Sequence, residues 1–325
     1  DSYYNAIINW VKQRYDLVVA KEMINFVPGI VPGIGMAMNC FTQKGDKVMI
    51  QPPVYHPFAW VTTRNERTLV TNPLKWENGM YRMDLDTFRE QIKGCKLFIL
   101  CNPHNPGGVV WTEAELRAIA DICYDEKVLV FSDEIHADLT LPPHTHRPFA
   151  TVSEKARMNS VTFMSPSKAF NMPGLSASHA LIFNEDLRKR FRIYMDAGEL
   201  DMGHVFAFLS VEAAYSHGTE WLDQCLAYIQ GNIDFVDDFL KNHAPKIKAI
   251  RPEASYLVWL DCRELKLSQK DLNEFFVDKA HLALNDGEMF GKEGIGFMRL
   301  NVASPRCIIE KAMKQLADAY QLYIK

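Results

Sequence analysis

The chain has 325 residues, which is long enough for two lobes with a substantial buried core. Hydrophobic residues make up 48% and charged residues 23% of the sequence, as in ordinary soluble globular proteins. The formal net charge is −4, and no basic cluster is longer than Arg188-Lys189-Arg190. These values argue against binding to nucleic acid or an anionic membrane through a basic face. No apolar run approaches the roughly 20 residues needed to cross a bilayer.

Seven cysteines are scattered along the sequence without forming a Cys-x-x-Cys pair. Neither a zinc ribbon nor a dithiol redox site is therefore indicated, and the scatter is typical of reduced thiols in a cytoplasmic protein. His144-Thr145-His146 could bind a metal ion, but its position beside Pro142-Pro143 favours a polar loop. We expect no metal site.

The first residues carry an amphipathic helical pattern, with Tyr4, Ile7, Ile8 and Val11 at three-to-four-residue spacing. Residue 1 is Asp rather than Met, so we expect the chain to begin inside a longer protein. The lack of a signal peptide here is then weak evidence about location. From about residue 20 to 200, short apolar runs alternate with longer helical segments. This alternation predicts an α/β fold with a mainly parallel sheet.

The first junction of interest joins an apolar strand pattern over 23–27 to the segment Pro28 to Gly33. Pro32 suits the first turn of a helix, where its missing donor is not needed. The free amides of Ile30 and Val31, at the positive end of that helix, could hold a phosphate. An ordinary strand-to-helix turn is the alternative.

A β-loop-α-β unit follows, with strands predicted over 95–101 and 128–133. Thr112 and Glu115 form a capping box that marks the start of the helix between them, and Trp111 and Leu116 occupy the positions of a hydrophobic staple. The unit places the loop 102–108 and Asp133 at the carboxyl ends of strands. Open α/β sheets bind ligands there.

Ser165-Pro166-Ser167-Lys168 directly follows another apolar run over 161–164. A lysine beyond one strand end and the carboxylate of Asp133 at another fit pyridoxal phosphate chemistry. The lysine would form a Schiff base, and the acid would keep a pyridine nitrogen protonated. A solvated surface lysine is the alternative.

After about residue 200 the pattern changes. A long helical stretch over 206–243 leads to a strand over 255–260, a helix over 268–279 and a strand over 296–302. This order predicts a smaller α+β domain. We therefore divide the chain into a large α/β domain, residues 1–203, and a small C-terminal domain, residues 204–325.

Four motifs occur in an order that resembles fold-type I pyridoxal-phosphate enzymes: NPHNPGG (102–108), SDEIHAD (132–138), SPSKAFN (165–171) and FMRLN (297–301). Together with QPPVYHPF (51–58), they are similar to the cystathionine β-lyase (MalY/PatB-like, cystalysin-like) branch of the class I/II aminotransferase family. The resemblance implies a large domain with a mainly parallel mixed sheet between helices, plus a smaller α+β C-terminal domain. It also implies a homodimer, and an N-terminal arm ahead of Asp1.

The resemblance assigns the catalytic residues. Lys168 matches the lysine that holds pyridoxal 5′-phosphate and, once freed by substrate, acts as the base at the substrate Cα. Asp133 matches the carboxylate that faces the pyridine nitrogen, and Tyr55 matches the aromatic ring stacked on the pyridine. Arg299 matches the residue that binds the substrate α-carboxylate.

Further cofactor contacts follow from the same resemblance. Asn105 matches the amide that binds the phenolic oxygen of the cofactor, and His136 lies beside it. Ser165 and Ser167 would bind the phosphate with the amides of Ile30 and Val31. Taken singly, such residues also suit structural roles, since His136 could be a core histidine and the 102–108 segment a plain turn.

These assignments predict a carbon–sulfur β-lyase that converts cystathionine or a related sulfur amino acid into a thiol, pyruvate and ammonia. An aminotransferase is the alternative, because both reactions share their early steps. A non-catalytic protein on the same scaffold is less consistent with the presence of Lys168, Asp133, Asn105 and Arg299. The sequence does not select the leaving group.

Overall fold

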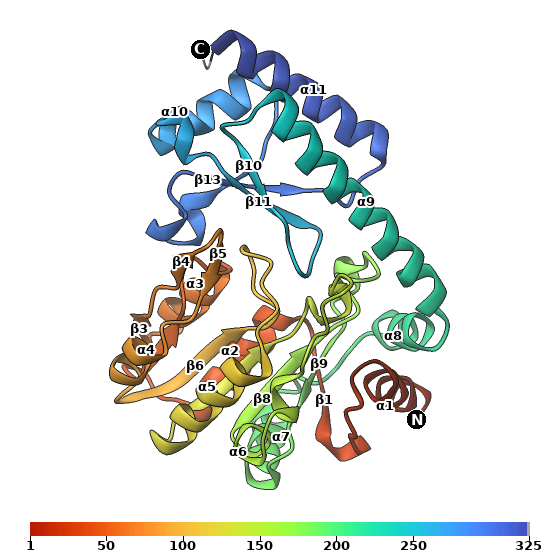
Figure 1. Ribbon diagram of the computed structural model, residues 1–325. Coiled ribbons are helices and arrows are strands. Elements are labelled where there is room, and N and C mark those ends of the chain that lie inside the picture. The colour runs from red at the N-terminus through yellow and green to blue at the C-terminus, as the bar shows by residue number, and fades with distance from the viewer. Residues whose placement is uncertain (324–325) are drawn as a thin grey trace.

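The computed structural model describes residues 1–323. Its large lobe is built on a seven-stranded sheet with the order β1-β9-β8-β7-β6-β2-β3 (Figure 1). The strands are β1 (Ile24–Val27), β2 (Lys47–Ile50), β3 (Thr68–Thr71), β6 (Cys95–Cys101), β7 (Leu129–Asp133), β8 (Ser160–Met164) and β9 (Ser178–Leu181). The five strands from β8 to β3 run parallel, and β9 is antiparallel to both of its neighbours. The sheet is mixed and mainly parallel, which confirms the prediction.

Helices cover both faces of this sheet because its central strands are apolar on both sides. Leu97 and Ile99 of β6 belong to a cluster that includes α2 and α3, whereas Phe98 and Leu100 point into the cluster under α5. This alternation follows the two-residue period of a strand. The helices of the lobe are α1 (Ser2–Tyr15), α2 (Ile30–Phe41), α3 (Pro57–Arg64), α4 (Leu85–Gln91), α5 (Glu113–Asp125), α6 (Glu154–Met158) and α7 (Glu185–Ala197). A two-stranded hairpin, β4 (Lys75–Glu77) and β5 (Met80–Arg82), lies beside them.

The small lobe contains a four-stranded antiparallel sheet with the order β10-β11-β13-β12. Its strands are β10 (Lys248–Ile250), β11 (Leu257–Asp261), β12 (Asn285–Asp286) and β13 (Phe297–Asn301). Its helices are α10 (Gln269–Glu274), which continues as a π-helical turn (Phe275–Lys279), and α11 (Arg306–Tyr323).

The helical stretch predicted over 206–243 is two helices, α8 (Val205–His217) and α9 (Thr219–His243). They meet at Gly218, where a Cβ atom would lie 2.4 Å from the carbonyl oxygen of Ala214 and 2.3 Å from the ring of Phe170. Only glycine fits this contact. Glycine is therefore required at the point where α8 meets α9.

The N-terminal helix α1 packs against α8, and α9 runs from there into the small lobe (Figure 1). The boundary predicted between residues 203 and 204 thus precedes a helix that contacts the large lobe. One buried apolar cluster continues from α1 through α9 to β11, β13 and α11. None of the helices described is long and apolar enough to cross a membrane.

Two local predictions explain why the site forms where it does. The capping box is present, since Thr112 Oγ1 accepts from the Glu115 amide at 3.2 Å and Glu115 Oε2 accepts from the Thr112 amide at 2.8 Å. Cys101 pairs with Asp133 in the parallel ladder, so β6 and β7 end side by side. The loops after β6, β7 and β8 therefore leave the sheet at one edge.

Candidate active site

A cavity of about 420 Å³ lies at the carboxyl edge of the large sheet and is closed on its other side by β11 and β13 of the small lobe. It contains nearly all of the residues predicted to bind cofactor or substrate. Those that line it are Ile30, Val31, Tyr55, Asn105, Asp133, His136, Ser167, Lys168 and Arg299. Residues as far apart in sequence as 30 and 299 therefore line one cavity.

Asp133 is the last residue of β7 and is buried. Burial raises the pKa of Asp133 to about 7, against the hydrogen bond that Oδ1 accepts from the Ile135 amide at 3.1 Å. The nearby charge of Lys168 lowers this pKa. A cationic ring nitrogen at this position would stabilise the carboxylate form.

Lys168 lies in the loop after β8 and is partly buried. Burial and the charge of Arg299 lower its pKa, while Asp133 raises it. A lowered pKa increases the fraction of neutral amine, which is the form that attacks carbonyl carbons and accepts protons. Lys168 thus has the environment of a reactive lysine.

His136 and Asn105 supply further polar groups to the cavity wall. Burial lowers the pKa of His136 to about 3, so its ring is neutral, and its buried Nδ1 has no hydrogen-bond partner. The backbone N–H of Asn105 donates to Cys101 Sγ at 3.3 Å, and its side-chain Oδ1 accepts from Arg299 Nη1 at 2.9 Å. The Asn105 side-chain nitrogen is left to donate into the cavity.

Tyr55 lies two residues before α3, and its ring packs edge-on against Phe58 at 5.8 Å between centroids. Burial raises the pKa of Tyr55, so its hydroxyl group stays neutral at physiological pH. The ring is fixed by packing and lines the cavity, as required of a group that stacks on a flat ligand.

The part of the cavity formed by the N-terminus of α2 suits an anion. Gly29 caps α2, so Ile30 and Val31 are the first two helical residues, whose amides have no partner within the helix. Ser167 lines the same wall. Ser165 does not line the cavity; its hydroxyl contacts Ser167 Oγ at 2.8 Å and the carbonyl oxygen of Ala177 at 2.7 Å. Ser165 therefore supports Ser167 from behind.

Arg299 lies on β13 and reaches the cavity from the small lobe. Its Nη1 donates to Asn105 Oδ1 at 2.9 Å, and its Nη2 donates to Asn285 Oδ1 at 2.7 Å. Its Cζ lies 4.7 Å from the centroid of the Phe290 ring. Burial lowers the pKa of Arg299 to about 10, which leaves it a cation at neutral pH. It is well placed to bind a carboxylate.

Several further cavity residues were not predicted. His56 follows Tyr55 within the 51–58 motif, which is the one signal that could have identified it. Tyr256 and Asn301 come from the small lobe, and no sequence feature connected Tyr256 to the strand ends. The others are Pro32, Cys101, Ile135, Pro173 and Leu257.

These groups fit pyridoxal phosphate. The buried acid matches the ring nitrogen of that molecule, and the partly buried amine matches its aldehyde. The asparagine amide matches the phenolic oxygen, and the free helix amides match the phosphate. The unpartnered Nδ1 of His136 is a buried polar atom that a ligand could satisfy.

The predicted absence of a metal site concerns His144 and His146. His146 Nε2 lies 2.7 Å from Glu134 Oε2 in the interior, whereas His144 Nδ1 lies 3.7 Å from Glu253 Oε1. Within residues 1–323, no group of three or more His, Cys, Asp or Glu side chains has the arrangement of a metal site. His146 instead anchors the loop that follows β7.

Comparisons with known proteins agree with this geometry. The family model for aminotransferase class I and II matches residues 1–316. Cystathionine beta-lyase PatB from Bacillus subtilis (strain 168) is 38% identical over 317 residues, which cover 97% of this chain and 82% of PatB. Cystalysin from Treponema denticola, whose crystal structure contains pyridoxal 5′-phosphate, superposes with a TM-score of 0.96 at 34% identity, covering 98% of this chain and 83% of cystalysin. The PLP-bound C-S lyase from Staphylococcus hominis superposes with a TM-score of 0.92 at 33% identity, covering 100% of this chain and 85% of that lyase.

Proposed function

Because this chain belongs to the aminotransferase class I and II family, we propose that it is a pyridoxal-phosphate-dependent carbon–sulfur β-lyase. Its substrates are cystathionine or related sulfur amino acids, and its products are a thiol, pyruvate and ammonia. The observation that carries the proposal is the cavity itself, which joins Lys168, Asp133 and Arg299 in a chain that is 38% identical to a cystathionine β-lyase.

Each residue has a distinct task in this reaction. When bound, pyridoxal phosphate would supply an electron sink for the electron pair left at the substrate Cα. Asp133 would hold the protonated ring nitrogen through an ion pair, and the Asn105 amide would donate to the phenolic oxygen. The amides of Ile30 and Val31 would hold the phosphate.

Arg299 and Lys168 act on the substrate. Arg299 would bind the α-carboxylate and so orient the Cα–H bond. The neutral amine of Lys168 would then take the Cα proton, the Cβ–S bond would break, and sulfur would leave as a thiolate. Addition of one water to the remaining three-carbon enamine gives pyruvate and ammonia.

The test is incubation of the enzyme with L-cystathionine in the absence of any keto acid. We expect pyruvate, ammonia and a thiol in equal amounts. A product that forms only when a keto acid acceptor is added would instead establish an aminotransferase. The Lys168→Ala variant should release no pyruvate, and borohydride reduction of the wild type should label Lys168 and no other lysine.

We also propose that the protein is a homodimer. The resemblance to fold-type I enzymes implies sites at a subunit interface, and four apolar side chains just before and at the start of α8 are exposed. They are Met202 (76%), Val205 (61%), Phe206 (66%) and Leu209 (54%). A second copy would bury them. Light scattering should give twice the mass of one chain, and replacing Phe206 and Leu209 by Glu should give a monomer. A monomeric wild type would contradict the proposal.

We also propose that the protein is cytoplasmic, because its cysteines are free thiols. All seven are free, and four of them are buried. Such thiols are typical of reducing compartments. Cell fractionation of the native protein would test this, and recovery outside the cytoplasm would contradict it.

A further inference from the structure

The guanidinium group of Arg299 is fixed by two side-chain hydrogen bonds and by an aromatic ring. A guanidinium group has five N–H donors. Two are used, by Asn105 Oδ1 at Nη1 and by Asn285 Oδ1 at Nη2. The buried Nε has no hydrogen-bond partner. The Cζ atom lies over the Phe290 ring, 4.7 Å from its centroid. The second N–H of each of the two amino groups, Nη1 and Nη2, is left to a ligand.

Asn285 reaches this position because of the small sheet. Asn285 on β12 is directly opposite Arg299 on β13 in the antiparallel register, so both side chains leave the same face of the sheet. Asn285 is exposed, and the 2.7 Å bond to Arg299 is the contact that its side-chain oxygen makes. Since arginine has no acceptor, the amide oxygen of Asn285 must be the atom that faces it.

We propose that Asn285 is a positioning residue that fixes the guanidinium of Arg299 so that its free donors face the substrate α-carboxylate. This inference rests on the carboxylate-binding role proposed for Arg299. Asn105 and Asn285 hold opposite amino groups of one guanidinium, and the side chain cannot rotate without breaking one of these bonds. A neutral amide achieves this without cancelling the positive charge that attracts the carboxylate.

The substitution Asn285→Asp distinguishes positioning from simple structural support. Aspartate has nearly the same shape as asparagine, so its effect on binding comes from the added charge and not from lost packing. A carboxylate 2.7 Å from Nη2 would instead pair with Arg299 and compete with the substrate. We expect KM for L-cystathionine to rise about tenfold or more in Asn285→Asp and severalfold in Asn285→Ala, with kcat within about twofold of wild type.

A binding measurement separates this inference from the proposed function. Calorimetry on the cofactor-loaded enzyme would compare 3-(methylthio)propanoate with its amide, neither of which has an amino group to react. The wild type should prefer the carboxylate, and Asn285→Asp should lose most of that preference while its cofactor absorbance stays unchanged. This holds whether the enzyme eliminates thiol or transfers an amino group.

The control is Asn242→Ala, which removes an exposed asparagine on α9 whose side chain bonds only the local carbonyl oxygen of Asp238. It should match the wild type in both assays. The inference is overturned if Asn285→Asp keeps the wild-type preference for the carboxylate, or if kcat falls as steeply as KM rises. Failure of the wild type to release pyruvate, with the preference intact, would reject only the lyase assignment.

Discussion

The carboxyl group of Asp133 lies in the cavity wall at the end of β7, enclosed by protein. Its pKa is raised to about 7 by burial, from an ordinary value of 3.8. Between these two values the folded protein keeps a proton that the unfolded chain has released. The free energy of unfolding of the cofactor-free protein therefore falls as pH rises from about 4 to about 7. The residue proposed to hold the ring nitrogen thus destabilises the empty fold.

The substitution Asp133→Asn should remove this penalty. At pH 8 we expect the cofactor-free variant to be more stable than the cofactor-free wild type by up to about 4 kcal/mol, since each pKa unit is worth about 1.4 kcal/mol. The difference should shrink toward zero near pH 4. Urea unfolding at several pH values measures it, and Asp278→Asn, at an exposed site, is the control. A variant that is less stable than wild type at pH 8 would contradict the argument.

Among elements, α2 has the most demanding position. It packs so closely on β1 and β8 that a Cβ atom added to Gly33 would lie 2.9 Å from Val27 Cγ2 and 3.2 Å from the Phe163 ring. Gly33 lies in the first turn of α2, so this packing constrains the positions of the Ile30 and Val31 amides. The anion-binding end of the cavity therefore depends on helix packing one turn away.

The substitution Gly33→Ala should push α2 away from the sheet. We expect a loss of about 1–3 kcal/mol in the free energy of unfolding from overpacking, together with weaker cofactor binding. The matched control is Gly231→Ala in α9, where the nearest atom to a new Cβ is Arg306 Nη2 at 3.5 Å. That variant should be unchanged or gain up to about 1 kcal/mol. Equal cofactor affinity in Gly33→Ala and wild type would show that α2 does not position the phosphate.

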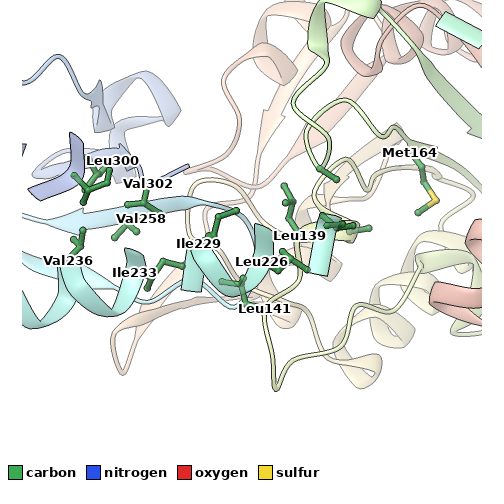
Figure 2. Packing of buried hydrophobic residues seen from close by; sticks show 14 of the residues in the cluster. Leu139, Leu141, Met164, Leu226, Ile229, Ile233, Val236, Val258, Leu300 and Val302 are labelled. Carbon is green, nitrogen blue, oxygen red and sulfur yellow. The ribbon is translucent and has the colours of Figure 1, made fainter. Parts of the chain in front are cut away.

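At the scale of the molecule, the two lobes share one core. Leu139, Leu141 and Met164 of the large lobe belong to the same cluster as Leu226 and Ile233 of α9 and as Val258, Leu300 and Val302 of the small sheet (Figure 2). The helix α9 thus carries apolar contacts from one lobe to the other. The cavity, which lies between the lobes, depends on this shared packing.

We therefore expect both lobes to unfold together. Calorimetry should show one transition, and Ile233→Ala, which truncates a fully buried side chain, should cost about 2–5 kcal/mol and lower the stability of both lobes. Hydrogen exchange would follow amides of β7 and β11 separately. Loss of protection in β11 alone would mean that the lobes are independent.

Local patterns in the sequence were sufficient for several elements of the large lobe, whereas most of the cavity residues were assigned through the family resemblance. The strand over 95–101, the capping box at Thr112, the strand end at Asp133 and the loop that carries Lys168 follow from periodicity, caps and strand ends. The ordered motifs supplied the cofactor and the reaction type. These features are local because hydrogen bonds and alternation within a few residues fix them.

Only the tertiary structure decided the rest. The need for glycine at position 218 depends on the Phe170 ring, and the burial of Ser165 depends on Ala177. The positions of Tyr256 and Asn285 depend on how the small sheet faces the large one. Contacts between residues far apart in sequence leave no trace in local periodicity. They exist because two lobes bury a common apolar core, and that burial brings Arg299 and Asn285 to the strand ends where Asn105, Lys168 and Asp133 already lie.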